Sequence, residues 1–231
     1  MLKEENIETR EIQNRYKWVY DGVISKFYDR SLKIGLSIFG EKKLRKHIID
    51  LISPLINQSD FILDLCCGTG TLTTMLATSV HSDCKIVGID LSEGQILQAV
   101  RKNHFSNLGF KVMDASNLKF ASESFNIVLI SAALHEMDKA LRYRVLQEVH
   151  RVLKKEGYLL IFDHHEPSEP KLRIFYNFYL GFWEKILSHS FEMQRNILRE
   201  LKGAKLEIIN QFILDKKFYK FFQVIISRKQ L

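Results

Sequence analysis

Short apolar runs alternate with segments of helical periodicity from residue 61 onwards. The runs predict strands at Phe61–Leu65, Lys85–Asp90, Phe110–Asp114, Phe125–Ile130 and Gly157–Asp163. Between them, apolar residues recur every three or four positions and predict helices at Leu72–Ala77, Ser92–Lys102 and Lys139–Leu153. Nearly continuous apolar strands that alternate with helices are typical of a parallel sheet covered on both faces.

The two ends of the chain follow other patterns. Residues 1–55 have helical periodicity up to Pro54 and are expected to form a separate helical segment. Leu206–Phe212 and Phe221–Ile226 are strand-like and separated only by a short basic turn, which suits an antiparallel hairpin. The predicted fold class is therefore α/β, with a doubly wound, mostly parallel sheet and an antiparallel C-terminal hairpin over residues 56–231.

An insertion at about residues 168–190 has an unusual distribution of apolar side chains. Pro170 suits the start of a helix. On one broad face lie Leu172, Phe175, Tyr176, Phe178, Tyr179, Leu180, Phe182, Trp183, Ile186 and Leu187. This face is wider than the roughly 100° stripe that seats a surface helix on a core. Part of it is expected to face the α/β domain and the rest to cover something else.

Composition narrows the class of protein. The 231 residues carry 34 Lys and Arg against 27 Asp and Glu, a formal net charge of +7. A basic surface can serve nucleic acid, an anionic membrane or an acidic substrate, or can simply be a solvated face. Cys66, Cys67 and Cys84 have neither disulfide-framework nor zinc-site spacing. A polar start and the absence of an apolar run of about 20 residues predict a cytoplasmic protein.

Acidic residues mark the predicted strand ends. Asp64, Asp90 and Asp114 lie at or near the ends of the first three strands, where ligands bind in open parallel sheets. Gly68 and Gly70 allow the backbone to pass close to a ligand. Asp90 follows Gly68 by 22 residues, close to the roughly 20-residue offset of an acid that binds ribose hydroxyls. Asp114 can receive an adenine amino group, although any of these acids can also be a helix N-cap.

Two ligands compete for such a site. A nicotinamide dinucleotide requires a third glycine, and Thr73 occupies that position. Asp64 would also place negative charge beside the diphosphate. An acid before the loop better suits a cationic ligand with an amino group, such as S-adenosylmethionine.

These motifs resemble those of class I S-adenosylmethionine-dependent methyltransferases. The matching segments are Ile62–Gly70, Val87–Ser92, Met113–Ala115, Phe125–Val128 and Glu148–Lys154 before Gly157. The similarity covers roughly Phe61 to Asp163. Cys66 is a departure, because many members carry glycine there.

The resemblance implies a set of cofactor-binding residues. Asp64 and the Gly68–Thr69–Gly70 backbone would face the methionine end, with Cys66 in the same loop. Asp90 would hold the ribose, Leu91 would lie against the adenine, and Asp114 and Ala115 would meet the adenine edge. Ser131 would begin a segment shared by cofactor and acceptor.

The N-terminal segment resembles a subgroup of these enzymes. Tyr20 and Tyr28 are similar in context to the aromatic segment that covers the cofactor in ubiquinone/menaquinone-biosynthesis and phospholipid methyltransferases. That subgroup carries an acceptor-covering insertion after the fifth strand, so residues 168–190 are expected to form a helical lid. Core packing is the alternative for the tyrosines, and core packing or a dimer contact for the insertion.

Catalysis of methyl transfer needs few protein groups, since the cofactor supplies the leaving group. His135, after the fourth strand, is the candidate general base, with capping of the following helix as the alternative role. Asp163, His164, His165 and Glu166 form a cluster, but adjacent side chains rarely converge on one ion, so no metal is expected.

The absence of several family-specific motifs narrows the possible classes of methyl acceptor. Ser131-Ala132-Ala133-Leu134 lacks the Asn/Asp-Pro-Pro-aromatic segment of enzymes that methylate exocyclic base amines. No cysteine follows Cys84, unlike arsenic methyltransferases, and no nucleic-acid-binding appendage is visible. A small, apolar or lipid-like acceptor of quinone or phospholipid type is expected, with peripheral membrane contact. A cofactor-binding domain that acts as a partner or regulator is the alternative function.

Overall fold

The computed structural model describes residues 41–184, 190–214 and 221–230. The strands are β1 (Phe61–Leu65), β2 (Lys85–Asp90), β3 (Leu108–Val112), β4 (Phe125–Ser131), β5 (Leu153–His164), β6 (Leu206–Ile213) and β7 (Phe222–Lys229). The helices are α3 (Glu41–Ile52), α4 (Thr71–Ala77), α5 (Glu93–Lys102), α6 (Lys139–Val152), α7 (Pro170–Glu184) and α8 (Ser190–Gly203). Two short 3-10 helices are η1 (Ser53–Leu55) and η2 (Leu134–Glu136).

All seven strands form one sheet, in the order β3-β2-β1-β4-β5-β7-β6. The first five strands are parallel, and β7 pairs antiparallel with both β5 and β6. The predicted fold class is confirmed, including the antiparallel C-terminal pair. The hairpin closes so that β7 lies inside the sheet and β6 forms its edge.

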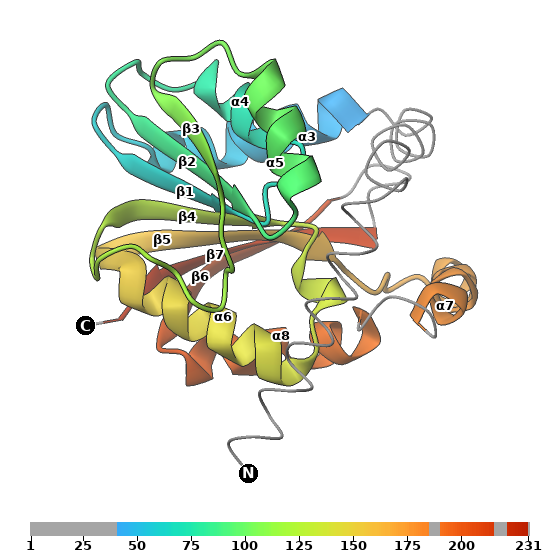
Figure 1. The fold of residues 1–231 in the computed structure, drawn as a ribbon. Coiled ribbons are helices and arrows are strands. Elements are labelled where there is room, and N and C mark those ends of the chain that lie inside the picture. The colour runs from blue at the N-terminus through green and yellow to red at the C-terminus, as the bar shows by residue number, and fades with distance from the viewer. Residues whose placement is uncertain (1–40, 185–189, 215–220, 231) are drawn as a thin grey trace.

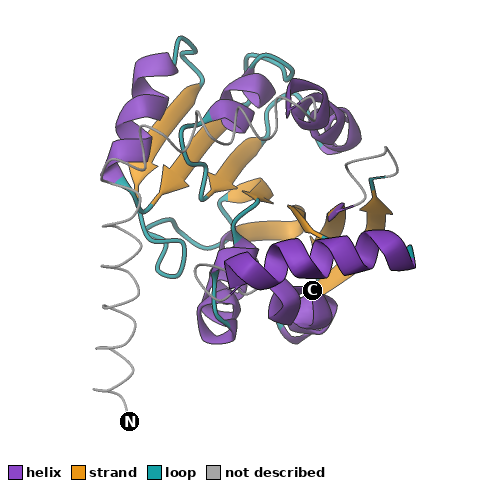
Figure 2. Cartoon of the chain, turned by 90° about the vertical axis from the view of Figure 1, so that its right-hand side faces the viewer, coloured by secondary structure: helices purple, strands orange, loops and turns teal. Residues whose placement is uncertain are grey.

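Helices cover both faces of this sheet. Figure 1 shows α3, α4 and α5 on one face and α6 and α8 on the other, and Figure 2 shows the helices from the side. Successive side chains of each strand point to opposite faces of the sheet and so contribute to the hydrophobic core on both sides. Ile62 packs with the α3–α4 side, while Leu63 and Leu65 belong to the core beneath α6 and α8. Burial of these side chains on both faces explains why the strands are nearly continuous apolar runs.

Predicted boundaries differ from the structure in several elements, including the third and fifth strands. The third strand covers Leu108–Val112, so Asp114 lies in the turn beyond it. The fifth strand begins at Leu153, immediately after α6, and includes Glu156 with a left-handed φ of 59°. Lys154 to Glu156 conceal this extension, because they carry no apolar side chain and lie in the register shift between the Phe125–Leu153 and Ile127–Tyr158 pairs.

The N-terminal and insertion segments are described only in part. Tyr20 and Tyr28 lie outside the described residues. Helix α3 buries Leu44, Ile48 and Ile52 in the core, and α7 begins at Pro170 as predicted. Among the described helices, none combines the length and the apolar character that crossing a membrane requires.

A buried ion pair joins the two helices that cover one face of the sheet. Arg142 of α6 is fully buried, and its Nε and Nη2 each donate to Glu200 of α8 at 2.9 Å. The Nη1 group donates to the backbone oxygen of Met137, the C-cap of η2. Arg142 therefore connects α6, α8 and η2 through one guanidinium.

Removing the carboxylate of this pair should destabilise the fold strongly. Glu200→Ala removes both 2.9 Å acceptors of a buried guanidinium and leaves it only Glu192, 3.5 Å from Arg142 Nη2. The free energy of unfolding should fall by about 3 kcal/mol. Urea denaturation followed by circular dichroism measures this loss. Asp50→Ala is the matched control, because it breaks the exposed Lys46–Asp50 pair and should cost less than about 1 kcal/mol. Equal losses for the two variants would contradict the assignment.

Candidate functional site

The candidate site lies at the carboxyl ends of β1, β2, β4 and β5, called here the carboxyl edge. Strand order reverses at β1, because the chain proceeds to β2 and β3 on one side and then to β4 on the other. The loops after β1 and β4 consequently diverge and leave a crevice between them, the usual ligand position in open α/β sheets.

The loop after β1 turns sharply toward this crevice. Gly68 and Gly70 have φ values of 56° and 70°, in the left-handed region that favours glycine. A Cβ on Gly70 would lie 2.6 Å from Phe110 Cζ, whereas a Cβ on Gly68 would meet only Gln95 Oε1, at 3.9 Å. Gly70 is thus required by packing, while the space beside Gly68 is open. Cys66, also left-handed at φ 56°, stands where a glycine would be unstrained.

Asp90 ends β2 and braces the glycine loop. Its Oδ2 accepts from the backbone N–H of Gly68, and its Oδ1 accepts from that of Ser92, both at 2.9 Å. Burial raises the pKa of this carboxyl, and the hydrogen bonds from Ser92 and Gly68 oppose the shift. The N-cap of α5 is Ser92, so Asp90 is not the helix cap that the sequence left open. Each carboxylate oxygen retains a further lone pair for a ligand hydroxyl.

Asp64 lies deeper beneath the same loop. Its Oδ2 accepts from Thr73 Oγ1 at 2.6 Å, and its Oδ1 is buried without a hydrogen-bond partner among the described residues. Burial raises the pKa of Asp64 to about 7, although Thr73 and Arg45 act in the opposite direction. A buried carboxyl with an unsatisfied oxygen is suited to a cationic group that enters from the crevice.

The other predicted cofactor residues surround these two acids. Asp114 lies in the turn after β3, where its Oδ1 accepts from the backbone N–H and the hydroxyl of Ser116, each at 2.8 Å. Thr69 and Ala115 are buried, and Leu91 and Ser131 are partly buried. The structure places these residues along the carboxyl edge. It does not describe Tyr20 and Tyr28.

The segment after β4 presents His135 at the other side of the crevice. Ala132 has a left-handed φ of 52°, which turns the chain into η2. The ring Nδ1 of His135 lies 2.7 Å from Asp163 Oδ1 at the end of β5. The alternative role of His135 as a helix cap is wrong, because Asp138 caps α6 by accepting from Leu141 N–H at 2.7 Å.

Asp163 determines the orientation of this histidine. The carboxylate is fully buried, and it also accepts from the backbone N–H groups of Leu134, His135 and His164. Burial raises the pKa of Asp163, but the interactions with His135 and His164 outweigh it and leave the pKa below its usual value. An ionised carboxylate only accepts, so Nδ1 of His135 must donate. In the neutral imidazole, Nε2 is then the basic nitrogen.

His164 stacks against this pair. Its ring centroid lies 4.3 Å from that of His135, and burial, followed by the charge of His135, lowers its pKa to about 3. His135, Asp163 and His164 present ligand atoms within 4.8 Å of one another and are the candidate metal-binding group among the described residues. Both Asp163 oxygens already accept two hydrogen bonds each, so the arrangement favours an orienting carboxylate over a metal ligand.

Two polar residues of this site were missed by the sequence analysis. Asp163 was considered only as part of a metal cluster, yet it continues the series of acids at strand ends and could have been found by that rule. Thr73 was noted only as a missing glycine, and its hydroxyl proves to be the partner of Asp64. No rule of sequence spacing predicts the contact between Thr73 and Asp64.

The residues fit S-adenosylmethionine. The unpartnered oxygen of Asp64 matches a cationic amino group, and the open side of Gly68 admits a ligand next to the backbone. Asp90 lies where a ribose would sit in this fold. A diphosphate would meet the Asp64 carboxyl and no third glycine.

Sequence comparison identifies relatives over most of the chain. Residues 62–157 match the family model described as a methyltransferase domain. The demethylmenaquinone methyltransferase of Staphylococcus epidermidis is 31% identical over 85% of this chain and 80% of its own length. An uncharacterized methyltransferase from Synechocystis is 34% identical over 70% of this chain and 71% of its own length.

Solved structures share the fold. An S-adenosylmethionine-dependent methyltransferase from Methanosarcina mazei superimposes with a TM-score of 0.64 at 24% identity, over 78% of this chain and 97% of that one. The geranyl diphosphate C-methyltransferase of Streptomyces coelicolor gives a TM-score of 0.64 at 14% identity, over 82% and 79% of the two chains. The structural likeness agrees in fold, and the 31% identity to the Staphylococcus epidermidis enzyme over 85% of this chain shows that the chain belongs to the S-adenosylmethionine-dependent methyltransferases.

Proposed function

We propose that this enzyme methylates a lipid-like acceptor with a hydroxylated ring, of the quinol type, using His135 as general base. The observation that carries the proposal is the 2.7 Å contact between His135 Nδ1 and buried Asp163, which leaves Nε2, 3.9 Å from Glu136 Oε1, as the basic nitrogen. The Staphylococcus epidermidis relative, named for demethylmenaquinone, supports a quinone-type acceptor over a phospholipid.

Each cofactor-binding residue then has a defined role. Asp64 binds the amino group, with the Gly68–Gly70 backbone beside the methionine end. Asp90 accepts from the ribose hydroxyls, while Asp114 meets the adenine amino group. Leu91 and Ala115 pack against the adenine, and Ser131 lies between cofactor and acceptor. Cys66 and Thr69 shape the loop.

The chemical step requires the protein to align the acceptor and accept one proton. S-adenosylmethionine supplies a methyl group already bonded to a sulfonium leaving group. His135 Nε2 accepts the proton that the acceptor loses as its bond to the methyl group forms. Asp163 stabilises the resulting imidazolium, as a buried carboxylate does for a catalytic histidine. No metal ion is required by this scheme.

Helix α7 serves as the lid of the acceptor site. Its Tyr176 is buried with its ring centroid 6.5 Å from that of His164, so this helix reaches the catalytic pair. Ile174 and Phe178 of the same helix are 71% and 82% exposed. We assign these two side chains to contact with membrane lipid, from which an apolar acceptor would enter. The side chains of Phe182 and Trp183 lie outside the described residues.

The competing function is a cofactor-binding partner or regulatory protein without turnover. Incubation with methyl-labelled cofactor and a detergent-solubilised demethylmenaquinol analogue separates the two. Label in the acceptor supports the proposed enzyme. Transfer only to phosphatidylethanolamine would replace the quinol-type acceptor, and no transfer to either compound or to components of its own cell extract would favour the regulatory function.

Asp64→Asn should change the pH dependence of stability. The folded carboxyl has its pKa raised to about 7 from 3.8, so the native state holds a proton that the unfolded chain releases as pH rises above 4. Stability of the unliganded protein should fall between pH 4 and 7, by at most about 4 kcal/mol, and remain low above pH 7. Asp64→Asn should abolish this fall and be the more stable protein at pH 8, measured by urea denaturation. Parallel pH profiles for the two proteins would contradict the assignment.

Asp90→Asn should weaken cofactor binding. The substitution replaces one acceptor oxygen with a donor and should cost about 2 kcal/mol, or roughly thirtyfold in the Kd for S-adenosylhomocysteine, measured by calorimetry. Asp83→Asn, an exposed carboxylate near the amino end of the same strand, is the matched control and should bind normally. An unchanged Kd for Asp90→Asn would indicate that Asp90 only supports the glycine loop and does not bind the cofactor.

His135→Ala should lower turnover by about 10²–10⁴-fold while leaving the Kd for S-adenosylhomocysteine unchanged, because a general base acts only in the chemical step. Turnover is measured with labelled cofactor, and the unfolding midpoint is measured in parallel. His104→Ala, an exposed histidine after α5, is the control. A loss of stability large enough to account for the lost turnover would indicate a structural histidine.

A further inference from the structure

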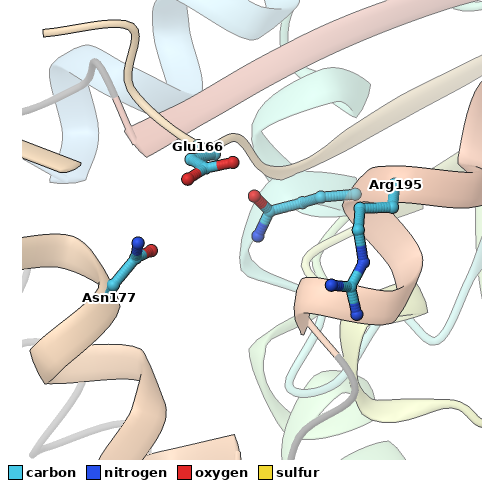
Figure 3. Close-up of a pocket in the computed structure, with 4 residues that line it drawn as sticks. Glu166, Asn177 and Arg195 are labelled. Atoms are coloured by element: carbon cyan, nitrogen blue, oxygen red, sulfur yellow. The ribbon is translucent and has the colours of Figure 1, made fainter. Parts of the chain in front are cut away.

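A polar hollow of about 360 Å³ lies between α7 and α8, apart from the cofactor crevice. The described residues that line it are Glu166, Asn177, Gln194 and Arg195. Figure 3 shows Asn177 on α7 at one side, Arg195 on α8 at the other, and Glu166 on the chain between β5 and α7. These four side chains supply one carboxylate, one guanidinium and two amides. We call it the α7–α8 hollow.

Arg195 and Glu166 are the charged groups of the hollow. Arg195 is exposed, and within the described part of the chain it makes no hydrogen bond or ion pair. Glu166 has a distant, exposed pair with Arg173, at 4.0 Å. Gln194 is held in place beside them, since its Nε2 donates to Tyr176 Oη at 2.7 Å. A ligand with an anion for Arg195 and N–H donors for Glu166 would bind both charged groups.

Apolar side chains lie directly beside the hollow. Ile174, Asn177 and Phe178 are spaced by three and four residues on α7 and therefore share one face of that helix. Asn177 lines the hollow, while Ile174 and Phe178 are among the most exposed large apolar side chains of the described chain. A polar recess flanked by exposed apolar side chains matches the boundary between lipid headgroups and acyl chains.

We propose that the α7–α8 hollow binds the headgroup of a membrane phospholipid that carries a phosphate and a primary ammonium. Arg195 binds the phosphate, and Glu166 receives the ammonium N–H groups. Ile174 and Phe178 enter the acyl region alongside. The membrane contact of α7 proposed above is extended by this site, which rests on it. The site has a chemical preference, because a trimethylated ammonium cannot donate an N–H to Glu166.

The bound lipid is a docking ligand and not the methyl acceptor. Tyr176 is buried, stacks on Phe221 with ring centroids 5.2 Å apart, and accepts from Gln194 at the hollow. Its ring centroid lies 6.5 Å from that of His164, which packs in turn on His135. The headgroup amine is thereby kept away from the basic nitrogen of His135.

Co-sedimentation with vesicles tests this site on the full chain. Wild-type protein should bind phosphatidylcholine vesicles that contain phosphatidylethanolamine about tenfold more tightly than phosphatidylcholine alone. Arg195→Gln should abolish that difference and leave the Kd for S-adenosylhomocysteine unchanged. Arg199→Gln, with the same charge change one turn further along α8 and outside the hollow, should retain it. Ile174→Ser with Phe178→Ser should weaken binding to both kinds of vesicle.

Several results would overturn the headgroup site. These are equal effects of Arg195→Gln and Arg199→Gln, no preference for phosphatidylethanolamine, or methylation of the ethanolamine amine during turnover. Binding of soluble glycerophosphoethanolamine without any vesicle binding would assign the hollow to a free metabolite instead. Methylation of the quinol analogue in detergent is measured separately, so failure of the acceptor assignment is distinguishable from failure of the headgroup site.

Discussion

Parallel pairing of β1 with both β2 and β4 is the constraint on which the site depends. It directs the carboxyl ends of these strands to one edge and sends the following loops in opposite directions. Asp64 and Asp90 therefore lie on one side of the crevice and His135 on the other. Pairing of β4 with β5 then brings Asp163 beneath His135, 28 positions apart in the chain.

Two buried charged groups of the framework have complete sets of partners among the described residues, whereas one in the crevice does not. Arg142 is neutralised by Glu200 and tied to Met137, and both oxygens of Asp163 are fully engaged by hydrogen bonds. Hydrogen bonds within the protein thus compensate the desolvation of Arg142 and Asp163, and these two side chains bind the two ends of η2. Asp64 has only Thr73 for one oxygen and nothing among the described residues for the other. A cationic ligand bound beside Asp64 would supply the missing partner and would thereby stabilise the fold.

Helix α7 relates the catalytic centre to the protein surface. One side contributes Tyr176, which is buried near His164, and the opposite side exposes Ile174 and Phe178. The apolar side chains of α7 are thus divided between a buried side and an exposed side.

Local sequence patterns determined much of this protein. Alternating apolar runs and helical periodicity are sufficient for a parallel sheet, and Gly68, Gly70 and Asp90 identify the cofactor loop, because each requirement is local to one strand and its turn. The tertiary structure alone decided which polar groups meet. Asp163 reaches His135, Thr73 reaches Asp64, and the lining of the α7–α8 hollow converges from three elements. Those contacts depend on strand order and helix packing, which bring together residues whose separation in the chain carries no periodic signal.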